Sequence, residues 1–160
     1  MTMTLVLVLL AILGSGCGER KTEVQLQGGN PPAFNLSGSG NLVALSIGIQ
    51  SQDKSLKPSE RIKKIWEIAP TTRDGKPVES IDTITYGIVP AGYRQIIPRE
   101  GQPPPLTEAN YYHYYFETIN APHAAGTFEI KNGRPLRVYG VAVCYSVEDG
   151  KEIEAPCYEN

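Results

Sequence analysis

The sequence has only two histidines, His113 and His123, and none of the short motifs that mark common catalytic centres. It contains no His-Glu-x-x-His zinc motif, no Gly-x-Ser-x-Gly nucleophile motif, no calcium-binding loop and no dinucleotide fingerprint. Few groups are therefore available for acid–base or metal chemistry. This scarcity favours a binding or structural protein over an enzyme.

The sequence also lacks an excess of charge of either sign. It has 15 Lys and Arg residues against 17 Asp and Glu residues, which gives a formal net charge of −2. Proteins that bind nucleic acid or anionic lipid through electrostatics carry a basic face. The interspersed charges of this chain predict no such face, so we expect no nucleic-acid partner.

No apolar run reaches the length of about 20 residues that a helix needs to cross a bilayer. The run Leu5–Leu13 has nine uninterrupted apolar residues and is followed by small residues. This pattern is typical of a secretory signal, in which a short apolar helix precedes the cleavage site. We expect residues 1–16 to be a signal peptide.

The residues at the end of that run, Leu13–Cys17, read LGSGC and resemble the lipobox of bacterial lipoproteins. In that family the signal is cut before the cysteine, whose sulfur carries a diacylglyceryl group. The resemblance implies a lipid on Cys17 that anchors the protein to the membrane of the bacterial cell envelope, where two or more acyl chains hold a protein stably. Because Gly14 stands where the family usually has Leu, two alternatives stay open: ordinary cleavage after Gly16, which gives a secreted protein, and an uncleaved anchor.

The three cysteines are an odd number, which in an exported chain calls for a separate role for one of them. If Cys17 carries lipid, Cys144 and Cys157 remain as a pair in an oxidising compartment. They flank Asp149-Gly150, a turn that predicts a hairpin, so a disulfide would join neighbouring strands and stabilise the fold by about 3 kcal/mol. The alternative is two buried thiols.

The organisation of the remaining chain follows from composition and periodicity. Residues 17–41 mix charge, Gly, Pro and Ser without a sustained hydrophobic period, which predicts a lipidated cysteine and a flexible tether. Period-two alternation from Leu42 onward predicts strands. We therefore expect one β-domain over 42–160.

Turn and strand signals refine this fold class. Asn132-Gly133 between two apolar runs predicts a hairpin, followed by one long strand that extends to Val147. Residues 59–69 fit both a helix and a strand, and Pro70 favours a strand over about 64–69 with room for one helical turn before it. The result is an all-β protein, an antiparallel β-sandwich of seven or eight strands. Pro90–Tyr93 resembles turns of prealbumin-like and fibronectin-like modules, and the whole chain resembles small β-sandwich lipoproteins with immunoglobulin-like architecture.

One strand carries the aromatic cluster Tyr111–Phe116. Alternation places Tyr112, Tyr114 and Phe116 on one face, which we expect to pack the core. Tyr111, His113 and Tyr115 lie on the other face and form a candidate binding face, because exposed aromatic rings suit contact with a partner. The alternative is cross-strand aromatic pairing.

These features lead to two functional hypotheses. The first is an envelope-anchored β-sandwich that acts as a binding or structural module and contacts protein or polysaccharide, without a cofactor or metal. The alternative is a small envelope hydrolase or metal-dependent enzyme that uses His113, Glu117 and His123. Convergent polar groups in a cleft would favour the enzyme, and an aromatic patch would favour the module.

Overall fold

The computed structural model describes residues 21–139 and 144–155. The predicted signal peptide over 1–16, the predicted lipidation site Cys17 and Cys157 lie outside these residues. Within them the chain forms twelve strands and two short 3₁₀ helices, η1 (Pro58–Arg61) and η2 (Val78–Ser80). None of the helices in the described ranges has the length and apolar character that crossing a bilayer demands.

The larger sheet has seven antiparallel strands. Its path is β10-β9-β8-β3-β4-β7, and β5 pairs with the start of β3. The strands are β3 (Asn41–Gln50), β4 (Ile62–Pro70), β5 (Lys76–Pro77), β7 (Tyr93–Ile97), β8 (Tyr111–Ile119), β9 (Ala124–Lys131) and β10 (Arg134–Val138).

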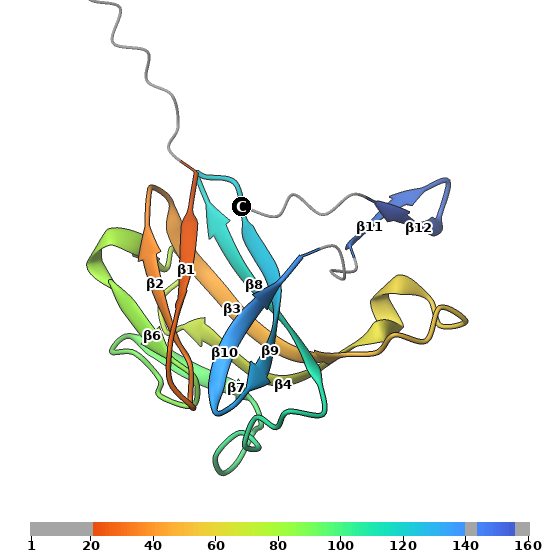
Figure 1. Ribbon diagram of the computed structural model, residues 1–160. Helices are drawn as coiled ribbons and strands as arrows, with labels where there is room; N and C mark the ends of the chain where they lie inside the picture. Colours follow the sequence, from red (N-terminus) through yellow and green to blue (C-terminus); the bar gives the residue numbers. More distant parts are fainter. Residues whose placement is uncertain (1–20, 140–143, 156–160) are drawn as a thin grey trace, which may run out of the picture.

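A smaller antiparallel sheet packs against the larger one (Figure 1). It has the order β1-β2-β6 and consists of β1 (Glu23–Gln27), β2 (Ala33–Ser37) and β6 (Thr83–Thr85). Phe34 of β2 is fully buried, and its ring lies 5.6 Å from the rings of Tyr114 and Phe116 across the interface. The two sheets therefore enclose one aromatic core, and the predicted antiparallel β-sandwich is confirmed.

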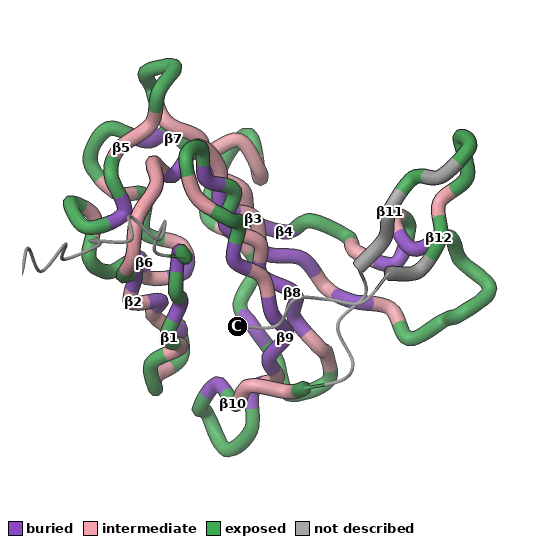
Figure 2. Tube along the Cα trace, turned by 90° about the horizontal axis from the view of Figure 1, so that it is seen from above, coloured by how far each residue is buried: buried purple, intermediate pink, exposed green. Residues whose placement is uncertain are grey.

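Period-two alternation decides which side chains enter that core. Tyr112, Tyr114 and Phe116 of β8 are at most 1% exposed, and each pairs with an inward-facing residue of β3. Burial of these large rings supplies much of the driving force for folding. Figure 2 shows the buried stretches running through the middle of the molecule, along the facing strands.

The prediction of a flexible tether over 17–41 is wrong for residues 23–37, which form β1 and β2. Val24, Phe34 and Leu36 are buried in the core. Each strand has only five residues, and a Gly- and Pro-rich turn separates them, so neither gives a sustained period in the sequence. The folded domain therefore begins before Leu42, and the described residues hold more strands than the seven or eight expected.

Residues 58–70 form η1 followed directly by β4, so the prediction of a strand after one helical turn is confirmed. Asn132 and Gly133 have φ values of +50° and +70° in the turn between β9 and β10, which confirms that hairpin.

The single long strand predicted after Gly133 is wrong. β10 ends at Val138, and a separate hairpin follows, made of β11 (Cys144–Glu148) and β12 (Lys151–Ala155) with its turn at Asp149-Gly150. Figure 1 shows this hairpin outside the two packed sheets. Leaving the edge of the large sheet at Val138 lets the chain reach η1, against which the hairpin packs.

Candidate functional site: a groove on the outer face of the large sheet

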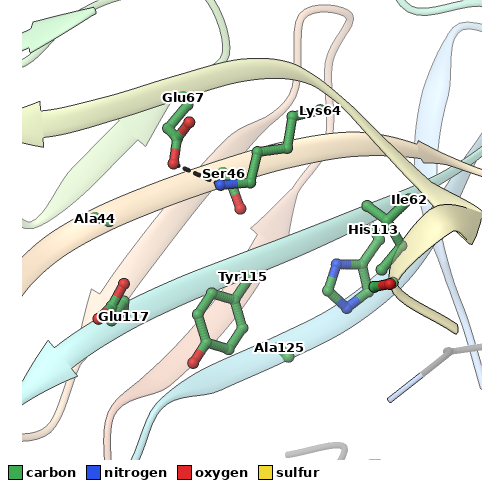
Figure 3. Close-up of a pocket in the computed structure, with 10 residues that line it drawn as sticks. Ala44, Ser46, Ile62, Lys64, Glu67, His113, Tyr115, Glu117 and Ala125 are labelled. Atoms are coloured by element: carbon green, nitrogen blue, oxygen red, sulfur yellow. Dashed lines mark hydrogen bonds and ion pairs between the residues drawn. The ribbon is translucent and has the colours of Figure 1, made fainter. Parts of the chain in front are cut away.

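A groove of about 510 Å³ lies on the face of the large sheet that points away from the core (Figure 3). Strands β3, β4, β8 and β9 and helix η1 contribute its lining: Ala44, Ser46, Ser59, Ile62, Lys64, Glu67, His113, Tyr115, Glu117 and Ala125. Its volume falls within the range of about 300–1,000 Å³ typical of small-molecule sites.

The groove is hollow because β3 carries small residues where its neighbours carry large ones. Ser46 pairs with Glu67 of β4 on one side and with Tyr115 of β8 on the other, and Tyr115 pairs in turn with Ala125 of β9. Small and large side chains therefore alternate across the sheet. The floor follows β3, and the walls rise from β4 and β8.

Gly48 extends the line of small residues on β3. It pairs with His113 and with Lys64, and a methyl group in its place would come within 2.6 Å of Ile62 Cγ2 and 3.0 Å of the Lys63 carbonyl oxygen. A side chain at this position would push β4 aside, so the close approach of β3 and β4 requires glycine.

His113 is the most deeply buried of the polar residues that line the groove, with 7% of its surface exposed. Burial lowers the pKa of its imidazole to about 4, so the ring is neutral at pH 7. Its Nε2 is the only buried side-chain nitrogen or oxygen in the described residues without a hydrogen-bond partner. Leaving such an atom unpaired costs about 1–3 kcal/mol of folding stability.

The charged residues of the groove stand on opposite walls. Lys64 Nζ and Glu67 Oε1 form an ion pair at 2.6 Å on the β4 side. Glu117 is exposed on the β8 side. One ammonium and two carboxylates give the lining a formal charge of −1. Lys64 balances Glu67, so the remaining negative charge is that of Glu117.

His123 does not line the groove. Its Nδ1 accepts a hydrogen bond from the Thr118 backbone N–H at 3.0 Å, and its ring lies 5.5 Å from the ring of Tyr115. Across the described ranges no group of three or more His, Cys, Asp or Glu residues can hold a metal ion. The alternative of a metal centre built from His113, Glu117 and His123 is therefore wrong: the first two share the groove, while the third supports Tyr115 from the side.

Only part of the candidate binding face predicted from the sequence lies in the groove. Tyr115 and His113 line the groove, whereas Tyr111, on the same face of β8, does not. His113 is buried rather than exposed, and both tyrosines are half-buried. The contributions of Ser46, Lys64 and Glu67 were missed, although the small residues of the β3 segment were the signal for a hollow beside the aromatic strand.

The β11–β12 hairpin closes one end of this region. Glu152 of β12 accepts hydrogen bonds from the Ser59 backbone N–H at 3.2 Å and from the Ser59 hydroxyl at 2.8 Å. These bonds lower the pKa of the Glu152 carboxyl, since they favour its charged form. On the other strand of the hairpin, Cys144 pairs with Ala155, so the predicted bond from Cys144 to Cys157 involves a partner outside the described residues.

A second hollow, of about 470 Å³, lies among loops at one end of the sandwich. Two of its polar groups are already engaged: the Tyr86 hydroxyl donates to the Pro104 carbonyl oxygen at 2.8 Å, and Asn30 Nδ2 donates to the Leu106 carbonyl oxygen at 3.4 Å. These contacts hold the loops together. The groove over β3 is therefore the better candidate for a ligand site.

Comparison with known proteins leaves the functional argument to this geometry. No protein-family model, no curated protein and no solved structure matches the chain.

Proposed function

We propose that this protein is a binding module of the bacterial cell envelope, anchored by lipid on Cys17, and that the groove over β3 is its ligand site. The apolar run Leu5–Leu13 and the LGSGC sequence support the address. The described domain supports the role of a module, because it is a small sandwich with one polar groove on a sheet face.

The observation that carries this proposal is the way the groove is built. Side chains of four adjacent strands point into one hollow, whose floor is the small-residue face of β3. The strands beneath are packed on their other face against the aromatic core. A site on such a rigid platform is formed before the ligand arrives, which lowers the entropy that binding must overcome.

Polar groups converge in this groove, which is the arrangement expected of an enzyme, but the contacts that already engage several of them favour binding over catalysis. Lys64 is occupied by Glu67, and His113 is neutral and enclosed. Among the described contacts, the lining hydroxyl that donates to a carboxylate is that of Ser59, at 2.8 Å from Glu152 of the docked hairpin. The lowered pKa of Glu152 makes this carboxylate a weak base, which does not suit activation of a nucleophile. What the groove does offer is a tyrosine ring, hydroxyls and carboxylates, which together hold a polar ligand.

The test is a variant that fills the groove without entering the core. Ser46→Trp places an indole on the outer face of β3, and Gln25→Trp places one on the exposed face of β1 as the matched control. Purified full-length variants are sedimented with washed, delipidated bacterial envelope. We expect wild type and Gln25→Trp to co-sediment and Ser46→Trp to lose at least about tenfold in binding. Equal binding by all three would show that the groove is not the site.

A further inference from the structure

The two central strands of the groove, β3 and β8, offer a ligand no free backbone. β3 lies between β8 and β4, and β8 lies between β9 and β3, so the ladders on both sides use their N–H and C=O groups. An extended peptide usually binds by adding to a sheet edge, where its own backbone groups find partners. In this groove, many backbone N–H and C=O groups of a bound peptide would have only side chains as hydrogen-bond partners.

A ligand whose polar groups are hydroxyls can be bound by hydrogen bonds to side chains alone. Glu67 and Glu117 supply carboxylate acceptors on the two walls, and Ser46 supplies a hydroxyl that can donate and accept. The Ser59 hydroxyl already donates to Glu152 and can only accept from a ligand. A sugar ring carries hydroxyls around its rim and can be bonded from several sides at once.

Tyr115 supplies the apolar surface that such a ligand also needs. Its ring lines the groove and is supported by the His123 ring at 5.5 Å. Tyrosine presents an apolar ring face together with a polar hydroxyl, and the C–H face of a sugar packs against a ring of that kind. The groove thus combines one stacking platform with acceptors on both of its walls.

Charge and size narrow the class of ligand. The lining has a formal charge of −1, with the only lysine paired to Glu67. Phosphates, sulfates and uronic acids would meet the unbalanced carboxylate of Glu117, which repels them. The volume of about 510 Å³ fits a short segment of a chain, not a folded partner.

We propose that the groove binds a neutral oligosaccharide, with one sugar ring stacked on Tyr115 and its hydroxyls bonded to Glu117 and Glu67. This inference rests on the binding function proposed above and names its ligand class. Of the two partner classes expected from the sequence, protein and polysaccharide, we choose polysaccharide. Binding of a peptide is the opposing outcome of the test.

The experiment titrates the full-length chain by calorimetry with three neutral tetrasaccharides: cellotetraose, maltotetraose and chitotetraose. Tetragalacturonic acid is the charged comparison, and an uncharged Gly-Ser hexapeptide is the peptide comparison. Tyr115→Ala and Glu117→Gln are paired with Tyr111→Ala and Glu129→Gln, which remove the same groups from the outer sides of β8 and β9, beyond the groove lining. Circular dichroism melts establish that each variant is folded.

We expect saturable binding of at least one neutral tetrasaccharide and none of the acidic one. Tyr115→Ala should weaken that binding at least about tenfold, as truncation of a central anchor does, and Tyr111→Ala should change it less than twofold. Binding of the hexapeptide in preference to every sugar, absence of neutral-sugar binding, or equal losses for the two tyrosine variants would each overturn the sugar assignment.

The two proposals fail in different ways. If no neutral tetrasaccharide binds but Ser46→Trp still abolishes envelope sedimentation, the groove is a ligand site and only the sugar class is wrong. If Ser46→Trp also leaves sedimentation unchanged, the proposed binding function falls together with it.

Discussion

Ser59 and Glu152 lie 93 positions apart in the sequence and are joined by two hydrogen bonds, from the Ser59 hydroxyl at 2.8 Å and from its backbone N–H at 3.2 Å. Ser59 belongs to η1 and lines the groove, whereas Glu152 belongs to the carboxyl-terminal hairpin. The pair therefore ties a two-stranded hairpin, which has little stability alone, to the end of the candidate site.

Loss of this pair should release the hairpin but leave the sandwich intact. Glu152→Gln keeps the size of the side chain and removes its charge, so amide hydrogen exchange in β11 and β12 should accelerate while exchange in β3 and β8 stays slow. Glu129→Gln is the control. Unchanged exchange in the hairpin would mean that other contacts hold it.

The same contact should depend on pH. The hydrogen bonds from Ser59 lower the pKa of the Glu152 carboxyl below its ordinary value. A carboxyl with a lowered pKa in the docked state stabilises that state above its ordinary pKa, and the effect is lost as pH falls through the lower value. Protection factors of the hairpin amides, which remove the intrinsic pH dependence of exchange, should therefore be lower at pH 3 than at pH 6 in wild type and differ much less in Glu152→Gln.

His113 should make the free energy of unfolding of the whole domain depend on pH, in a higher pH range than that of Glu152. Its pKa is about 4 in the folded protein and about 6.5 when exposed, so the unfolded chain binds the extra proton between these values. The contribution of His113 to stability should be constant above pH 7 and fall by up to about 1.4 kcal/mol per pH unit as the pH drops from 6.5 to 4. Urea melts of His113→Gln between pH 4 and pH 7 should therefore show a flatter profile than those of wild type.

The two faces of β8 should respond in opposite ways to truncation. Tyr114 is 1% exposed and contacts the Phe34 ring at 5.6 Å, so Tyr114→Ala should lower the free energy of unfolding by about 3 kcal/mol or more. Tyr115→Ala should have a much smaller effect, because that ring is half-buried beside the groove. Equal losses in chemical denaturation would assign a structural role to both rings.

The lipid anchor predicted at Cys17 has a direct chemical test. Cys17→Ser should move the protein from the membrane fraction to the soluble fraction, since the thiol that accepts the lipid is gone. Intact mass spectrometry of the wild-type mature protein should show an acylated amino-terminal cysteine. An unmodified mature amino terminus at Cys17 would contradict the prediction.

The bond predicted between Cys144 and Cys157 is tested by thiol chemistry. Labelling of the denatured, unreduced protein should leave both cysteines unmodified, and labelling after reduction should modify both. Reduction should also lower the melting temperature, because a bridge across the hairpin restricts the unfolded chain. Two labelled thiols before reduction would exclude the bond.

The sequence predicts local features of this fold well because they depend on neighbouring residues. Alternation in β8 separates Tyr114 from Tyr115, and Asn132-Gly133 has the backbone freedom that its turn requires. The strand that carries Phe34 was missed, since five residues beside a proline-rich turn resemble a linker when their partners are unknown. Its burial depends on a sheet formed with residues far along the chain.

In the candidate site too, the residues of one strand were predicted and those brought in by strand pairing were not. Tyr115 and His113 were singled out because rings and an imidazole alternate within one strand. Ser46 and Glu67 come beside them only through the pairing of β4, β3 and β8, a register that a single sequence does not specify. Chemical types can thus be read from the chain, whereas the groove exists only after non-local strands have paired.

The small residues of β3 also separate two properties that mutation usually changes together. Leu45 and Ile47 point into the core, and Ala44 and Ser46 point into the groove. Substitutions at one set alter folding stability, and substitutions at the other alter the depth and polarity of the hollow. Evolution or a protein engineer can therefore change what this surface accepts at alternate positions of one strand, while the residues between them keep the scaffold unchanged.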